Sequence, residues 1–321
     1  MMLVFSALAA ALSTGEAQAA APSLLTPPPF SGYAFDPRAD ARHFLFTEDA
    51  QVEEFARVRI LAAYDRDSVV SSYDLGQPGA DAADERLALV GDVWTLHPVF
   101  TRGWGALRLT GGVPLYVRSQ PDIVKIDGRS QRYAGTAAGS ALGDAHIGVK
   151  GVMLDAGTAP IGLATFGRVA VPLGAADQYL GQPGVSGELG LTAQWLTART
   201  DLGLSVAHRF LPKVDLGNIE VDDQLQYTLA GALDLGPGGI TGELWGRAQY
   251  SGSGAGRSIG PSSRNNPVQV LAGGWLDTTR GGRVRLLGGT GLTPGLGAAT
   301  VRVVLSVEQG LQKDRQSSSG E

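Results

Sequence analysis

Charged side chains recur at every second position of several stretches in this sequence. Arg57 and Arg59 are separated by one residue, as are Arg283 and Arg285. Alternate side chains of a β-strand lie on the same face, so this spacing would gather the charges on one side of a sheet. Guanidinium groups placed there can pair with carboxylates, or they can attract anions to a water-filled path.

Sixteen charged residues share that face of the predicted strands. The basic members are Arg57, Arg59, Arg86, Arg108, Lys150, Arg168, Arg209, Arg247, Arg283, Arg285 and Arg302. The acidic members are Asp92, Asp144, Glu188, Glu243 and Glu308. Eleven basic and five acidic residues leave an excess of six positive charges, although the whole chain has a formal net charge of −5. We predict that this set, without Arg86, Asp92 and Arg283 and with His146 added, lines the interior of a barrel.

The inward charges allow two interpretations. One is a salt-bridge network that fills a narrow lumen, and the other is a water-filled pore whose excess of arginine favours anions. The two interpretations are compatible with each other.

Catalytic chemistry is not indicated. The chain has no cysteine and only four histidines, too dispersed for a metal cluster. A hydrolytic site on a barrel needs a serine beside a histidine. His208 is predicted on the lipid face and Ser205 on the opposite one. We therefore expect no enzyme and no cofactor, and the negative net charge gives no sign of a nucleic-acid partner.

The elements that carry these residues have the pattern of long β-strands. Hydrophobic residues make up 43% of the chain, yet no internal run approaches the roughly 20 apolar residues of a membrane helix. Between Asp201 and Phe210, apolar residues alternate with small or polar ones. Twelve segments of about 10 to 15 residues, long enough to cross a bilayer when tilted, show this alternation. They are 54–64, 85–98, 104–118, 143–154, 161–173, 186–198, 201–211, 223–235, 240–250, 267–276, 282–291 and 299–309.

The connections alternate between short turns and long loops. Short turns are predicted at 101–103, 155–160, 199–200, 236–239 and 277–281, and longer loops at 65–84, 119–142, 174–185, 212–222 and 251–266. Only the loop near 292–298 is short. On the proposed lipid face, aromatic residues lie near the strand ends: Tyr64, Trp195, Phe210, Tyr227 and Tyr250. This layout is typical of an all-β, transmembrane antiparallel up-and-down β-barrel of about twelve strands in a bacterial outer membrane, with both termini periplasmic.

The N-terminal stretch is apolar and ends in a small-x-small site at Ala17 to Ala19, which indicates a signal peptide over 1–19. We predict an N-terminal periplasmic segment over 20–53, the barrel over 54–309 and a disordered polar tail over 310–321.

Several motifs resemble those of a known bacterial barrel family. They are Phe35-Asp36-Pro37, His43 to Phe46, the Gly-Asp-x-x-x-Gly-x-Lys strand Gly143 to Lys150, Val171 to Gly174, and Tyr179 to Gly181. The family is the barrel domain that often precedes an OmpA-type peptidoglycan-binding domain, and it is similar to outer-membrane transporters linked with phenol degradation. Its multidomain members carry that C-terminal domain, whereas this sequence ends about a dozen residues after the last predicted strand. The terminal aromatic residue common in such barrels is also missing.

Four functions follow in order of preference. The first is a passive or facilitated pore for small solutes, with anions favoured. The second is a structural barrel with a plugged lumen, as in the barrel part of an OmpA-like anchored protein. The third is a soluble periplasmic barrel that binds a lipophilic ligand, and an enzyme is last. The expected partners are the lipid bilayer, the barrel-insertion machinery and small solutes.

Overall fold

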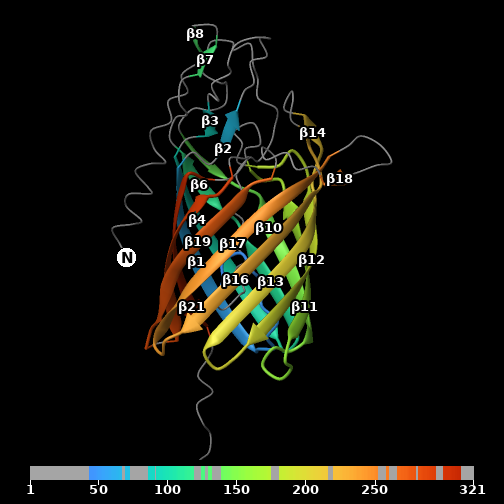
Figure 1. Cartoon of the computed structure of the whole chain (residues 1–321), viewed down its shortest axis with the longest axis vertical. Coiled ribbons are helices and arrows are strands. Elements are labelled where there is room, and N and C mark those ends of the chain that lie inside the picture. The colour runs from blue at the N-terminus through green and yellow to red at the C-terminus, as the bar shows by residue number, and fades with distance from the viewer. Residues whose placement is uncertain are drawn as a thin grey trace, which may run out of the picture.

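The computed structural model describes residues 43–66, 69–72, 86–90, 92–118, 124–126, 129–131, 139–174, 181–215, 220–251, 258–259, 266–279, 281–293 and 299–311. All regular elements in these ranges are β-strands, and most of them form one closed barrel (Figure 1). No helix in the described part is long and apolar enough to cross a membrane.

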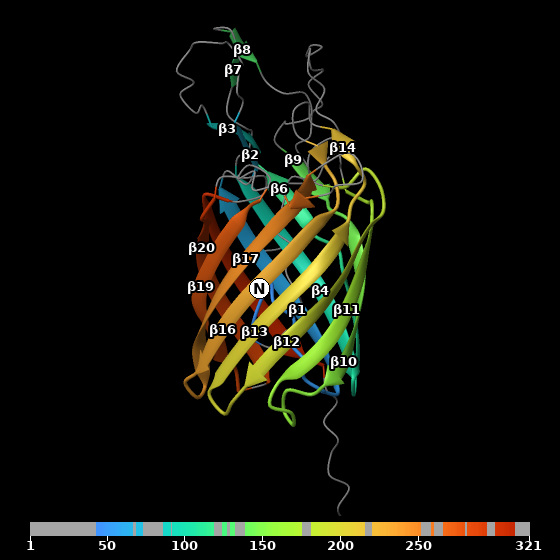
Figure 2. The same cartoon turned by 45° about the vertical axis from the view of Figure 1, so that its right-hand side comes forward.

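Twelve antiparallel strand positions make the barrel wall, in chain order. They are β1 (Phe55–Arg66), β4 (Val93–Trp104), β5 (Leu107–Gly112) continued by β6 (Leu115–Arg118), β9 (Gly139–Leu142) continued by β10 (Ala145–Leu154), β11 (Gly162–Val171), β12 (Ser186–Leu196), β13 (Thr200–Phe210), β16 (Gln224–Asp234), β17 (Gly238–Ser251), β19 (Val268–Asp277), β20 (Gly282–Gly291) and β21 (Val301–Gly310). The barrel closes because β1 pairs with both β4 and β21. Closure pairs the backbone groups that a sheet edge would expose, and the strands lie oblique to the barrel axis (Figure 2). The predicted fold class is confirmed.

The alternating sequence pattern becomes an inside and an outside. In β12, Leu189, Leu191 and Trp195 are exposed on the outer surface, whereas Glu188 and Gln194 are buried inside. Large exposed apolar side chains continue around the wall, as lipid contact requires. Of the predicted interfacial aromatics, Trp195 and Phe210 are 47% and 49% exposed, and the side chain of Tyr250 lies outside the described residues.

The second strand differs from its prediction. The wall strand is 93–104 and not 85–98, and the tight turn lies at Gly105-Ala106 and not at 101–103. Gly105 has a φ of 61°, which glycine adopts without a steric penalty, whereas Gly103 continues the strand. The third predicted strand is interrupted between β5 and β6 at Pro114, which has no N–H to donate to a ladder.

Two charged residues change their predicted place because of this shift. Arg86 belongs to β3 (Arg86–Val90), which pairs with β2 (Val69–Ser72) and is not a wall strand. Asp92 lies on the outer side, where it accepts a 3.0 Å hydrogen bond from the Tyr64 hydroxyl. Neither residue belongs to the inward set.

Long connections gather at one end of the barrel and tight turns at the other. The loop end carries β2, β3, β7 (Val124–Ile126), β8 (Arg129–Gln131) and β14 (Val214–Asp215), seen at the top of Figure 1. Two further short strands are β15 (Glu220–Val221) and β18 (Ser258–Ile259), which pair with β14 and β17. The opposite end is called the turn end below.

Candidate functional site

The fourteen predicted lumen residues all lie in the barrel wall, thirteen on strands and Asp144 between β9 and β10. Their side chains are buried or half-buried, while the outward neighbours of most of them are exposed. The wall therefore carries its charges on the inner face.

Three arginines converge on one carboxylate in the lumen. Glu308 in β21 binds Arg59, which approaches through Nε at 2.8 Å and also through Nη2. Arg57 Nη1 lies 3.1 Å from Glu308, and Arg285 Nη2 lies 3.5 Å away. Strand pairing explains the cluster, because Arg59 and Glu308 are direct cross-strand partners. Arg59 and Arg285 are each 1% exposed, so this is an interior ion-pair network.

Other inward charges are paired with wall residues as well. The Arg302 guanidinium binds Asp65, and its Nη1 donates to Gln269 at 2.5 Å. Near the loop end, Asp144 accepts hydrogen bonds from the backbone N–H groups of Gly174 and Gln182, at 3.0 and 2.7 Å. That carboxylate ties a long loop to the wall.

A second row of charges crosses three neighbouring strands. The register places Arg168 of β11 opposite Glu188 of β12, and Glu188 opposite Arg209 of β13. One carboxylate thus lies between two guanidinium-bearing positions. Arg247 lies further round the wall and stacks over the Trp245 ring at 4.6 Å.

Residues 43–51 are buried inside the barrel, and Val52 and Glu53 connect them to β1 near the turn end. Residues 43–53 together are called the lumen segment below. Phe44, Leu45 and Phe46 are at most 1% exposed. The Phe46 ring lies 5.8 Å from that of Trp245. This placement corrects the prediction that 20–53 is a periplasmic segment for its described part, and residues 1–42 lie outside the described residues.

The backbone of the lumen segment is not part of a β-sheet. Side chains of the wall accept hydrogen bonds from its N–H groups instead. Glu243 Oε1 accepts from Leu45 at 2.6 Å and Oε2 accepts from Phe46 at 2.7 Å. Further along, Gln194 Oε1 accepts from Ala50 at 2.8 Å. Near the turn end, Asp155 Oδ1 accepts from Val52 at 3.1 Å. Polar side chains of the wall thus accept hydrogen bonds from the backbone N–H groups of the lumen segment, which would otherwise be buried without a partner.

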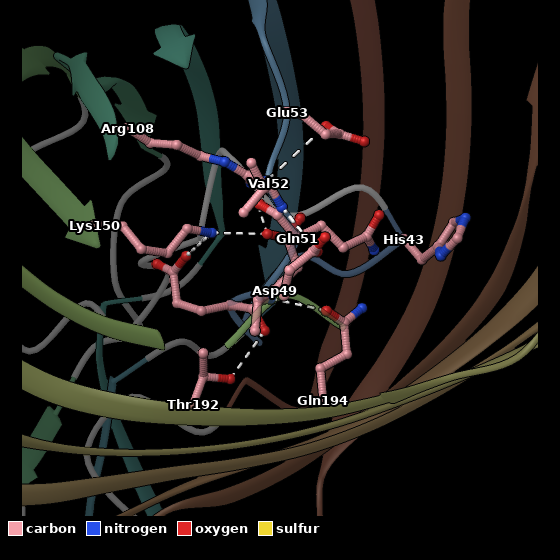
Figure 3. A network of polar contacts seen from close by, with 12 residues as sticks. His43, Asp49, Gln51, Val52, Glu53, Arg108, Lys150, Thr192 and Gln194 are labelled. Atoms are coloured by element: carbon pink, nitrogen blue, oxygen red, sulfur yellow. Dashed lines mark hydrogen bonds and ion pairs between the residues drawn. The ribbon is translucent and has the colours of Figure 1, made fainter. Parts of the chain in front are cut away.

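Two cations of the wall hold the acidic part of the lumen segment (Figure 3). Asp49 Oδ1 lies 2.6 Å from Arg108 Nη1 and 2.9 Å from Lys150 Nζ. Lys150 also lies 3.2 Å from Glu48 Oε2, and Arg108 donates to the Gln51 carbonyl. Arg108 and Lys150 are 0% and 3% exposed, so these charges meet away from bulk water.

The far end of the lumen segment is anchored by a histidine. His43 Nδ1 donates to Asp201 Oδ2 at 2.8 Å, and its ring stacks on Trp275 with 4.9 Å between centroids. A cavity of about 120 Å³ beside them at the turn end is also lined by Arg199 and Asp234. It is large enough for a few water molecules, given about 30 Å³ for each in the liquid.

The lumen segment changes the charge of the interior. Ten basic residues of the predicted set face inward, as do four of its acidic residues, and the side chain of Arg86 is outside the described part. The walls add Asp65 and Asp201, and the lumen segment adds Glu48, Asp49 and Glu53. With Asp277, which pairs with Arg283 near the turn end, these carboxylates offset the predicted excess of six positive charges. Three of these carboxylates belong to the lumen segment and pair with wall cations.

The sequence pattern groups most wall charges on one face, but it does not indicate their partners in the lumen segment. The family motif His43 to Phe46 is expected in the periplasm from the sequence and lies inside the barrel instead. Thr192, Gln194 and Ser205 fall on the polar face of their strands, and all three contact the lumen segment. Neutral polar residues at these inward positions were the signal that a buried backbone lies against them.

No protein-family model matches the chain, and no curated protein sequence matches it. Among solved structures it is similar to the COG4313 outer membrane channel from Pseudomonas putida F1, with 14% identity and a TM-score of 0.57, over 82% of this chain and 98% of that one. A weaker likeness is to the beta domain of the Bordetella autotransporter BrkA, with 12% identity and a TM-score of 0.42, over 79% of this chain and 98% of that one. The first likeness, at this identity, shows the fold alone. The class is thus that of outer-membrane β-barrels, and the link to OmpA-type domains or phenol degradation stays a prediction.

Proposed function

We propose that this chain is an outer-membrane pore for small solutes, with anions favoured, and that the lumen segment narrows its path. The observation that carries the proposal is the contrast between a charged inner face and an apolar outer surface on one closed wall. A barrel used only as a membrane scaffold needs the apolar surface but not ten inward basic residues.

The ion pairs of the wall define how such a pore would work. Charges that pair across strands hold the wall without blocking it, as Arg59 and Glu308 do. The lumen segment occupies the turn-side half of the interior, since its contacts include Asp155 and Asp201 near the turns. Solutes would pass beside this segment, or after it has moved.

The proposed orientation in the membrane is the one that bacterial outer-membrane barrels share. Tight turns face the periplasm and long loops face outward, which places the start of β1 and the end of β21 on the periplasmic side. The bilayer and the barrel-insertion machinery are then the partners of the folded and the folding chain. We propose no enzymatic role. Ser205 binds Thr192 in the interior, while His208 lies beside Asp223, 3.3 Å away.

The test is single-channel conductance of the refolded full chain in a planar bilayer under a salt gradient. Discrete openings with a reversal potential on the anion side are expected. Openings with a cation preference would contradict the solute class, although not the pore.

A structural barrel with a plugged lumen is the second candidate. The observation in its favour is the depth of the lumen segment, whose residues Phe44, Leu45 and Ala50 are 0% exposed. A correctly refolded full chain that stays electrically silent, and that conducts only after the lumen segment is removed, would favour this alternative over the pore.

A further inference from the structure

Arg108 and Lys150 form a pair of neighbouring cations on the inner face. They are direct cross-strand partners on β5 and β10, and both are at least 97% buried. Two buried positive charges side by side repel each other and lose hydration, so they require counter-charges. The lumen segment provides them.

The way these cations hold the lumen segment is the way proteins bind a free carboxylate. Asp49 Oδ1 lies between the guanidinium of Arg108 and the ammonium of Lys150, at 2.6 and 2.9 Å. Charge-assisted hydrogen bonds of this length are among the strong ones in proteins. A second carboxylate, that of Glu48, lies 3.2 Å from the same Lys150 ammonium. The carboxylates of two adjacent residues thus both lie within 3.2 Å of one ammonium nitrogen.

We propose that Arg108 and Lys150 form a binding site for a short dicarboxylate, and that Asp49 and Glu48 of the lumen segment occupy it at rest. This inference rests on the proposed function as a pore, and it names the solute class. The carboxylates of the lumen segment, which is covalently part of the chain, then compete with the solute for Arg108 and Lys150. Solute binding at the two cations removes the ionic hold on the segment, and the path beside it widens.

The covalent attachment of the lumen segment determines how tightly a free dicarboxylate can bind. The segment is also held by Glu243, Gln194 and the Phe46–Trp245 contact, so its carboxylates remain next to the cations at high effective concentration. A free dicarboxylate must compete with them and will bind weakly to the unmodified chain. Removing a carboxylate from the segment should strengthen solute binding.

The experiment titrates the refolded full chain in detergent with succinate at constant ionic strength, and follows binding by calorimetry. The variants are Asp49→Asn and the charge-balanced pair Asp49→Asn with Lys150→Gln. Heat-modifiable gel migration verifies that each barrel has folded. Asp49→Asn should bind succinate at least about ten-fold more tightly than the unmodified chain, and the double variant should lose that gain.

Neutral succinamide is the matched probe and should not bind. Equal binding of succinate by the single and the double variant would overturn the site, as would no binding by a folded Asp49→Asn chain. Binding of sulfate as tight as that of succinate would overturn the dicarboxylate assignment.

A conductance measurement distinguishes a failure of the proposed binding site from a failure of the proposed pore function on which it rests. A chain that binds succinate through Lys150 but passes no current keeps the site and rejects the pore. A chain that conducts, while its Asp49→Asn variant binds no succinate, keeps the pore and rejects the site.

Discussion

The side chain of Glu243 in β17 binds the backbone of Phe46, because its Oε2 accepts a hydrogen bond from the Phe46 N–H at 2.7 Å. Its other oxygen accepts from the neighbouring Leu45 N–H at 2.6 Å. A single wall carboxylate therefore satisfies two consecutive N–H groups of the lumen segment. The two residues are 197 positions apart in the chain, so the contact links the segment before the first strand to the ninth wall position.

Glu243→Gln should loosen the lumen segment. A glutamine side chain keeps one acceptor oxygen, but its amide group would face the second N–H donor, and an unsatisfied buried donor costs about 1–3 kcal/mol. We expect faster cleavage near residues 43–53 by an added protease and more frequent channel openings. Glu188→Gln is the control, since Glu188 is also a buried wall carboxylate but lies opposite Arg168 and not beside Phe46. Equal effects of the two variants would show that cleavage reports general barrel instability.

The methyl group added by Gly203→Ala should clash with the lumen segment. A Cβ atom at Gly203 would lie 2.7 Å from Thr47 Cγ2 and 3.1 Å from Phe44 Cε2, closer than carbon atoms pack. We expect either a loss of about 1–3 kcal/mol in unfolding free energy or displacement of the segment, seen as higher conductance. Gly148→Ala is the control, because its Cβ would find no atom closer than 3.5 Å. Unchanged stability and conductance in Gly203→Ala would argue against the placement of Thr47.

Glu308→Gln should destabilise the barrel itself. It leaves Arg57, Arg59 and Arg285 close together without their shared carboxylate, and breaking a buried ion pair on one side costs about 3–5 kcal/mol. Urea unfolding followed by tryptophan fluorescence measures the change. The exposed Glu54, changed to Gln in the same way, should unfold like the unmodified chain. A Glu308→Gln barrel of unchanged stability would mean that water or salt ions screen the cluster.

Arg168→Gln should reduce the preference for anions without moving the lumen segment. Arg168 lies opposite Glu188, which remains opposite Arg209 after the change, so the row keeps one balanced pair. The reversal potential under a salt gradient should shift toward the cation side. Arg199→Gln, at an exposed position in the turn between β12 and β13, removes the same charge from the turn-end mouth of the barrel and should shift it less. Equal shifts would show that surface charge, and not the lumen, sets selectivity.

The barrel was predictable because period-two alternation is a local signal. Outward Leu189 and Leu191 and inward Glu188 identify β12 as a lipid-facing strand without any knowledge of its neighbours. The error at the second strand also has a local cause. Gly103 resembles a turn residue in sequence, but Gly105 is the one with positive φ.

The lumen segment was not predictable because its partners are remote. Asp49 pairs with Arg108 and Lys150, 59 and 101 residues further along the chain. Nothing in the sequence near Asp49 alternates or forms a helix, so the segment resembled a linker. The arginine excess that suggested an anion pore is offset by these remote carboxylates together with wall carboxylates such as Asp65 and Asp277.

The closure of the wall between β1 and β21 has a consequence for biogenesis. The lumen segment is covalently continuous with β1, and the seam joins the first strand made to the last. The cylinder cannot be sealed until translation and export of the whole chain are complete. The last pairing step acts on the strand that directly continues residues 43–53, so closure of the wall also fixes the point at which this segment enters the interior.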